Sequence, residues 1–159
     1  MTHDPEKLAR NWALNSGVGF LIRLIEARYD ALYRDLTSQE AITPRQFGVL
    51  IALHQQGALT LTRLAAVINA DRATLGEMVK RMSQRKLVHR RDNGNDARSY
   101  EISLTSKGRT VLLELVPGAA RLQEAFLAPV SPGKRGEFLE SLRAVAYGAA
   151  PPHKNASGR

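Results

Sequence analysis

The chain has 159 residues and carries 23 Lys and Arg against 15 Asp and Glu, which gives a net charge of +8. This length suggests one domain, and the basic balance favours a polyanionic partner, either nucleic acid or an anionic membrane surface. The absence of cysteine excludes disulfides, thiolate metal sites and thiol redox switches. No stretch approaches the ~18 apolar residues of a membrane span. The N-terminus has no apolar signal segment, so we expect a cytoplasmic protein. Of the two possible partners, we predict nucleic acid and no membrane, for the reasons of charge and pattern given below.

From Asn11 to about Leu36, apolar residues recur at three- and four-residue steps, which predicts a helix. Phe20 and Leu24 widen its apolar stripe, so this helix is expected to pack against two surfaces. Residues 1–10 are polar, and we expect them to be frayed.

A helix–turn–helix is predicted in the middle of the chain. Thr43 is the expected N-cap of a preceding helix that ends at Gly57. Two short helices follow, capped by Thr60 and Asp71 and separated by a turn at Asn69.

The stretch "VHRRDNGNDARSYEISLT", residues 88–105, predicts one hairpin in an otherwise helical chain. Tyr100, Ile102 and Leu104 alternate with polar residues, as in a half-buried strand. Residues 93–94, Asn-Gly, favour a turn. Helical patterns then cover residues 105–147, with a break or kink at Pro117. The tail 148–159 is expected to be disordered. The fold class predicted is mainly α with a small β-hairpin, in one domain over residues 1–159.

The second helix of the helix–turn–helix has two different faces. Leu75, Met78, Val79 and Met82 fall on one side of a helical wheel, which predicts the buried side. The opposite face mixes Ala73, Glu77, Lys80 and Gln84, with Thr74 and Arg81 beside them. Such a helix enters the major groove of DNA, where Arg or Lys pairs with guanine and Glu accepts from cytosine. Its N-terminus can also bind a phosphate. The alternative is an ordinary amphipathic helix with a solvated charged face.

Charge favours the DNA-binding interpretation. Residues 71–109 hold ten Lys and Arg and five Asp and Glu, so +5 of the total +8 lies in 39 residues. A basic hairpin directly after a helix–turn–helix is typical of a wing, whose tip can reach the minor groove. Arg98 is the candidate there. Alternatively, Arg98 is a surface arginine paired with Asp96, and the two interpretations are compatible.

The segment "TLTRLAAVINADRATLGEMVKRMSQRKLVHRRDNGNDARSYEISLTSKGR" resembles the core of the MarR (multiple antibiotic resistance regulator) family of winged-helix transcription factors. The most specific part is Asp96 and Arg98 followed by "LTSKG" at residues 104–108. The resemblance implies a winged-helix lobe over about residues 44–104. It also implies a homodimer joined through helices at about 11–36 and 105–147, and a repressor that binds a palindromic operator in double-stranded DNA. Many members carry a second arginine beside the position of Arg98, where this chain has Ala97 and Ser99. The candidate DNA-binding residues are Arg72, Ala73, Thr74, Glu77, Lys80, Arg81, Arg90, Asp96 and Arg98.

The resemblance also implies release by a small molecule, often a phenolic compound, an aromatic acid or its CoA thioester. An aromatic carboxylate needs an apolar pocket with one or two cations. Candidate effector-binding residues are Trp12, Phe20, Arg23, Tyr29, Phe47 and His54. For each a simpler role remains open: Phe20, Tyr29 and Phe47 as core, His54 as a cap or surface residue, and Arg23 as the partner of Glu26 or Asp30. Without cysteine, the family's peroxide-sensing chemistry is excluded.

Other classes of function have less support. We find no nucleophile elbow, no glycine-rich phosphate loop, no paired carboxylates in a plausible cleft and no metal-ligand spacing among the four histidines. The sequence therefore predicts a protein that is not an enzyme and uses no metal and no cofactor. A winged-helix module that binds another protein, and a constitutive DNA-binding regulator without an effector, remain the alternatives.

Overall fold

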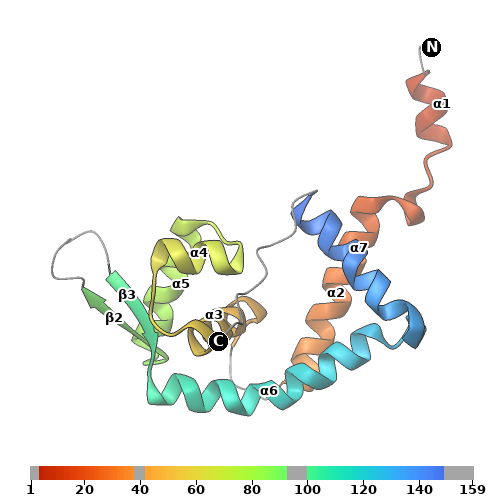
Figure 1. The fold of residues 1–159 in the computed structure, drawn as a ribbon. Coiled ribbons are helices and arrows are strands. Elements are labelled where there is room, and N and C mark those ends of the chain that lie inside the picture. The colour runs from red at the N-terminus through yellow and green to blue at the C-terminus, as the bar shows by residue number, and fades with distance from the viewer. Residues whose placement is uncertain (1–3, 38–41, 93–99, 149–159) are drawn as a thin grey trace. The chain divides into compact units, whose positions relative to one another are not determined.

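The computed structural model describes residues 4–37, 42–92 and 100–148 (Figure 1). The chain divides into two compact units, Met1–Leu122 and Gln123–Arg159. The first unit holds the helices α1 (Pro5–Arg10), α2 (Val18–Leu36), α3 (Pro44–Gln56), α4 (Leu61–Ile68) and α5 (Arg72–Gln84), a small sheet, and most of α6 (Ser106–Leu127). The second holds the last turn of α6, the 3-10 helix η2 (Pro132–Lys134) and α7 (Arg135–Tyr147).

The N-terminal helix was predicted to start at Asn11, and this prediction was wrong. A short helix α1 spans Pro5–Arg10, where we expected frayed chain. Asp4 caps it by accepting from the Glu6 N–H at 3.0 Å, and Pro5 supplies a preset first turn. After the 3-10 helix η1 (Leu14–Ser16), Gly17 adopts extended backbone, and the long helix α2 runs from Val18–Leu36.

Much of the apolar surface of these N-terminal segments is exposed. Tyr33 is the buried residue of α2. Large apolar side chains with at least 40 % of their surface exposed are Leu8, Trp12, Leu14, Val18, Leu21, Ile22, Leu24 and Ile25. Soluble proteins seldom expose so much contiguous apolar surface without a partner to cover it. Among the described residues, these side chains of α2 therefore remain uncovered.

The predicted helix–turn–helix and the helix before it are confirmed. Helix α3 (Pro44–Gln56) begins with a capping box in which Thr43 and Gln46 each bind the other's backbone N–H, at 3.3 and 3.1 Å. It ends at Gly57, whose φ of +78° suits glycine. Helix α4 (Leu61–Ile68) starts at the Thr60 cap, and Asn69 adopts the left-handed conformation that ends it. Helix α5 follows, Arg72–Gln84.

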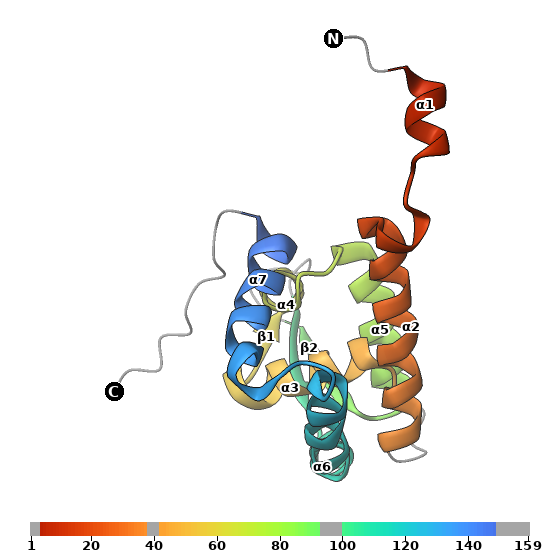
Figure 2. The ribbon, with the colours of Figure 1, turned by 90° about the vertical axis from the view of Figure 1, so that its right-hand side faces the viewer.

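The hairpin is confirmed too, and it belongs to a three-stranded antiparallel sheet. The strands are β1 (Leu59–Thr60), β2 (Val88–Asp92) and β3 (Tyr100–Leu104), in the order β1-β3-β2. The sequence did not indicate β1, because two residues are too few to show an alternating pattern. Helices α3, α4 and α5 gather beside the sheet in both views (Figures 1 and 2). We call α3–α5 with this sheet the winged-helix lobe.

One buried cluster holds the lobe together. The side chains that are essentially inaccessible come from every helix of the lobe, from β2 and β3, and from the first half of α6. They include Leu50, Leu64, Leu75, Met82, Val88, Ile102, Leu112 and Leu115. Each buried side chain of this size stabilises the fold by about 1.5–3 kcal/mol relative to an exposed one. Helix α5 and the hairpin are therefore parts of one packed body.

Helix α6 was predicted to break or kink at Pro117, and no break occurs. It spans Ser106–Leu127 with Pro117 inside it. The residue after Pro117 is Gly118, and the close approach of α2 explains why it is a glycine. A Cβ on Gly118 would lie 2.2 Å from the carbonyl oxygen of Leu36, so only glycine admits the end of α2 here. Arg121 also donates to that carbonyl at 3.4 Å.

Helices long and apolar enough to cross a membrane do not occur among the described residues.

Candidate nucleic-acid interface

Helix α5 presents one buried face and one exposed face, as its sequence predicted. Leu75, Met78, Val79 and Met82 are 0–8 % exposed and pack into the core. On the opposite side Arg72, Ala73, Thr74, Glu77, Lys80 and Arg81 are all exposed. The outer face therefore offers a guanidinium, an ammonium, a carboxylate and a hydroxyl side by side. These groups match the donors and acceptors on the edges of bases in the major groove.

The N-terminus of α5 is fixed by its cap. The Asp71 carboxylate accepts from the backbone N–H of Thr74 at 2.9 Å. Hydrogen bonds from the backbone and side chain of Thr74 hold the pKa of Asp71 below its ordinary value. Ionised Asp71 thus stabilises the first turn of the helix at neutral pH. The positions of Arg72, Ala73 and Thr74 follow from this capped turn.

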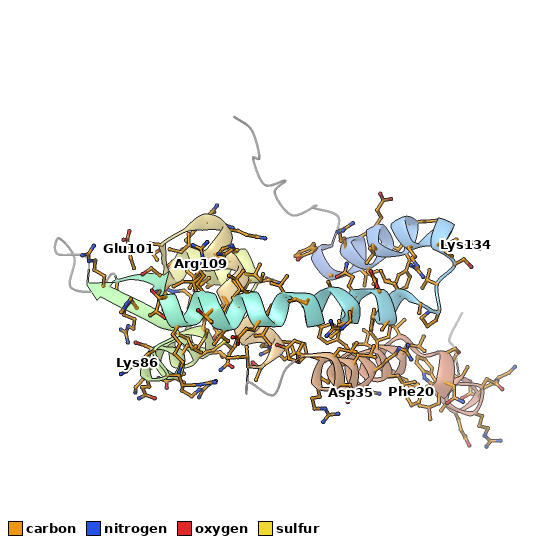
Figure 3. The ribbon with its side chains drawn as sticks, turned by 90° about the horizontal axis from the view of Figure 1, so that it is seen from below. Phe20, Asp35, Lys86, Glu101, Arg109 and Lys134 are labelled. Carbon is orange, nitrogen blue, oxygen red and sulfur yellow. The ribbon has the colours of Figure 1, made fainter. Side chains whose placement is uncertain are left out.

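The end of α5 is tied to the start of α6 through the base of the hairpin. The Thr105 hydroxyl donates to the carbonyl of Lys86 at 2.6 Å and accepts from the backbone N–H of Gly108 at 2.9 Å. Gly108 lies against the backbone, since a Cβ there would be 2.0 Å from the carbonyl oxygen of Leu87. Figure 3 labels Lys86 and Arg109 on either side of this junction.

The contacts at this junction explain why the "LTSKG" segment contains a threonine and a glycine at residues 105 and 108. Lys86 has a φ of +60°, so the chain turns sharply between α5 and β2. Thr105 and Gly108 hold that turn by hydrogen bonding and by close approach. Leu104 packs against the core. Thr105 therefore helps to fix how the hairpin leaves α5, although it lies 19 residues after Lys86 in sequence.

The described part of the hairpin carries a run of basic side chains. His89, Arg90 and Arg91 are all exposed on β2. The guanidinium carbon of Arg90 lies 3.9 Å from the centre of the Tyr100 ring, in a cation–π contact. The tip residues Asp96 and Arg98, with Ala97 and Ser99, lie outside the described residues. So does the Asn-Gly pair at 93–94.

Comparison with known proteins fits this geometry. The model of the MarR family matches residues 42–100, which run from the start of the lobe to the first residue of β3. The HTH-type transcriptional repressor NicR of Pseudomonas putida is 29 % identical over 126 residues, which cover 79 % of this chain and 80 % of NicR. The family model that matches and the curated relatives are of the MarR type. This chain is a transcriptional regulator of the MarR type.

Solved structures of MarR-type regulators share its fold. The PcaV regulator of Streptomyces coelicolor, in complex with its natural ligand, has a TM-score of 0.81 and 29 % identity, over 87 % of this chain and 98 % of PcaV. BpsR of Bordetella bronchiseptica, whose DNA binding is regulated by 6-hydroxynicotinic acid, has a TM-score of 0.77 and 27 % identity. That match covers 85 % of this chain and 97 % of BpsR. The winged-helix fold class and the MarR resemblance are therefore confirmed.

The six candidate effector-binding residues of this MarR-type regulator have very different surroundings. Trp12 is 69 % exposed between α1 and η1, and Arg23 and His54 are exposed. Phe20 is partly buried on α2, where Figure 3 labels it. Phe47 packs against the core of the lobe, as its simpler role required. The ring of Tyr29 stacks on that of Tyr33, with centroids 6.4 Å apart.

Sequence analysis did not single out Tyr33 as the buried residue of α2. Its side chain is 4 % exposed. Burial, with Tyr29 alongside, raises the pKa of the Tyr33 hydroxyl to about 12. The signal was present as one step of the apolar stripe in residues 18–36, which gave no reason to separate this tyrosine from its neighbours.

A hollow of about 500 Å³ lies next to α5. The first turn of α3 lines one side of it, through Pro44, Arg45 and Gly48. The turn from Ile68 to Asp71 and the side chains of α5 line the other. The six candidate effector residues are not part of this hollow. Clusters of three His, Asp or Glu side chains that could hold a metal ion are absent from the described ranges.

Proposed function

We propose that this MarR-type regulator is a homodimeric repressor that binds a palindromic operator and is released from it by a small aromatic acid or phenolic compound. The observation that carries the proposal is the outer face of α5. Its exposed Arg72, Glu77 and Lys80 stand on a helix whose other face is locked into the core. A rigid helix with such a face is what reading of base edges in the major groove requires.

The apolar surface of α1, η1 and α2 supports the homodimer. Side chains such as Trp12, Val18 and Ile22 are between 49 % and 70 % exposed. A second copy of the chain that covered this surface would bury it from water and place two recognition helices around a two-fold axis. Half-sites about one turn of DNA apart, roughly 34 Å, would then match the two helices.

The relatives support the ligand class. BpsR is described as regulated in its DNA binding by 6-hydroxynicotinic acid, an aromatic carboxylate. Without any cysteine, an effector of this chain acts by noncovalent binding. The effector needs only to favour a dimer whose recognition helices are mis-spaced for DNA. A tenfold loss of DNA affinity requires about 1.4 kcal/mol of coupling.

We expect duplex DNA from the promoter region of the protein's own gene to bind the purified dimer, and an aromatic carboxylate to weaken that binding. Fluorescence anisotropy with and without 6-hydroxynicotinic acid and a panel of hydroxybenzoic acids tests both parts, and sedimentation gives the oligomeric state. Binding that no member of the panel weakens would favour a constitutive regulator. A folded dimer without DNA affinity at low salt would refute the proposal and favour a protein-interaction module.

A further inference from the structure

The two neighbouring arginines of β2 lie on opposite faces of the sheet. Strand β2 pairs with β3 so that Arg90 faces Ile102 and Arg91 faces Glu101. Directly opposed residues of an antiparallel pair share a face, and successive residues alternate between faces. Because Ile102 is fully buried, Arg90 lies on the face that packs on the helices. Arg91 lies on the outer face, opposite a carboxylate.

On the face of β2 that packs on the helices, Arg90 lies beside α5. Val88 comes two residues earlier on that face, and it is buried. Helix α5 is in contact with β2. Arg90 itself is exposed, so it is the first accessible position where this face of the strand leaves the core. Its charge is therefore presented on the same side of the sheet as α5.

Tyr100 holds Arg90 in that position. Its own cross-strand partner is Asp92, so the ring is the diagonal neighbour of Arg90 on the shared face. The ring is partly buried and packs against the core, which fixes it. With the guanidinium carbon 3.9 Å from the ring centre, Arg90 loses less side-chain freedom on binding a partner than a lone surface arginine would. A stacked guanidinium keeps its N–H donors in one plane, which suits paired hydrogen bonds to a phosphate.

We propose that Tyr100 is a positioning residue that presents Arg90 to the DNA backbone beside α5, and that Arg91 has no comparable role. This inference rests on the proposed DNA-binding function. It gives a structural reason to separate Arg90, a candidate DNA-binding residue, from its neighbour Arg91.

The test compares variants of the full chain on one promoter duplex, with affinity measured by anisotropy over a range of salt. Arg90→Ala is expected to flatten the slope of log affinity against log salt by about 0.9 per protomer, the value for one lost phosphate contact. Arg91→Ala, the matched control, is expected to flatten it by less than half as much. Tyr100→Leu is expected to weaken binding by about two- to fivefold, the range of an exposed cation–π contact, whereas Tyr100→Phe keeps the ring and the affinity.

A double-mutant cycle shows whether the two residues act together. Tyr100→Leu should have no further effect on affinity when Arg90 is already alanine. Arg90→Lys, which leaves the core untouched, should bind more weakly than the wild type and more tightly than Arg90→Ala, because it keeps the charge but not the planar stack. This variant carries the test if thermal unfolding shows that Tyr100→Leu does not fold.

Three results would overturn the inference. The first is an effect of Arg91→Ala as large as that of Arg90→Ala. The second is an effect of Tyr100→Leu that persists in the Arg90→Ala background, and the third is wild-type affinity in Arg90→Lys. If the wild-type chain itself bound no DNA in this assay, the proposed function would fail, and the inference with it.

Discussion

Replacing Gly108 by alanine is expected to lower the free energy of unfolding by about 3 kcal/mol or more, beyond the usual cost of overpacking a core. The added Cβ would lie 2.0 Å from the carbonyl oxygen of Leu87 and 2.9 Å from its carbonyl carbon. Both atoms are backbone, so no side chain can rotate away to relieve the overlap. Thr105 also binds the backbone of Lys86 and Gly108, so a shift of α6 would break these hydrogen bonds. Urea unfolding followed by circular dichroism measures the loss.

Gly48→Ala is the matched control for this substitution. Gly48 also lies within a helix, α3, but an added Cβ would meet nothing within 4 Å. Alanine there should raise stability by about 0.5–1 kcal/mol, because glycine is the poorer helix former. Equal stability of Gly108→Ala and wild type would show that α6 and the hairpin base are not packed as described.

Replacing Lys80 by glutamate is expected to weaken binding to operator DNA by about ten- to a hundredfold per half-site, or about 1.4–2.7 kcal/mol. Lys80 lies at the middle of the exposed face of α5, one turn after Glu77. The substitution removes a cation that can bind a phosphate or guanine and places a like charge against the DNA. Because Lys80 is exposed, the thermal midpoint should change little. Anisotropy titrations and thermal unfolding of the same preparation give both quantities.

Lys134→Glu changes the net charge by the same amount and serves as the control. Lys134 is exposed and belongs to η2 in the second unit, which contributes no residue to the winged-helix lobe as defined above. We expect less than a threefold effect on DNA affinity from this variant, on the order of what screened long-range repulsion produces. If both variants weakened binding equally, overall charge rather than the face of α5 would account for the affinity.

Sequence reasoning succeeded where local chemistry decides the structure. The Thr43, Thr60 and Asp71 caps were predicted from residue type and spacing, and each accepts the expected backbone hydrogen bond. The faces of α5 followed from the helical period, because its core side is uniformly apolar. The hairpin followed from alternation in one strand. In all these cases a few consecutive residues hold the whole signal.

Sequence reasoning failed where contacts between distant parts of the chain determine the structure. A break or a kink was predicted at Pro117, and the break does not occur: α6 continues through this residue, with Gly118 next to the carbonyl of Leu36 more than 80 residues away in sequence. Strand β1 has only two residues and exists because Ile102 and Glu101 pair with it. Helix α1 forms in residues 5–10 with Asp4 as its N-cap, although this segment is too polar for a helix to be predicted from its apolar pattern.

The candidate site likewise has residues that the sequence predicted and contacts that only the structure shows. The exposed residues of α5 were found from the helical wheel, and the cation–π contact of Arg90 with Tyr100 was not, since it needs the register of two strands. The most specific sign of the family was Asp96 and Arg98 followed by the "LTSKG" segment. Only the structure shows the contacts with Lys86 and Leu87 that account for it. The roles assigned to the wing-tip residues Asp96 and Arg98 remain predictions.

The salt dependence of DNA binding tests the central claim most directly. The affinity of the wild-type chain for a promoter duplex would be measured by anisotropy at several concentrations between 50 and 200 mM NaCl. With about four or more phosphates contacted by Lys and Arg, the affinity should fall at least about a hundredfold over this range, along a straight line in log affinity against log salt. An affinity that did not change with salt, or no binding at 50 mM by a folded dimer, would contradict the assignment of α5 and the wing to DNA.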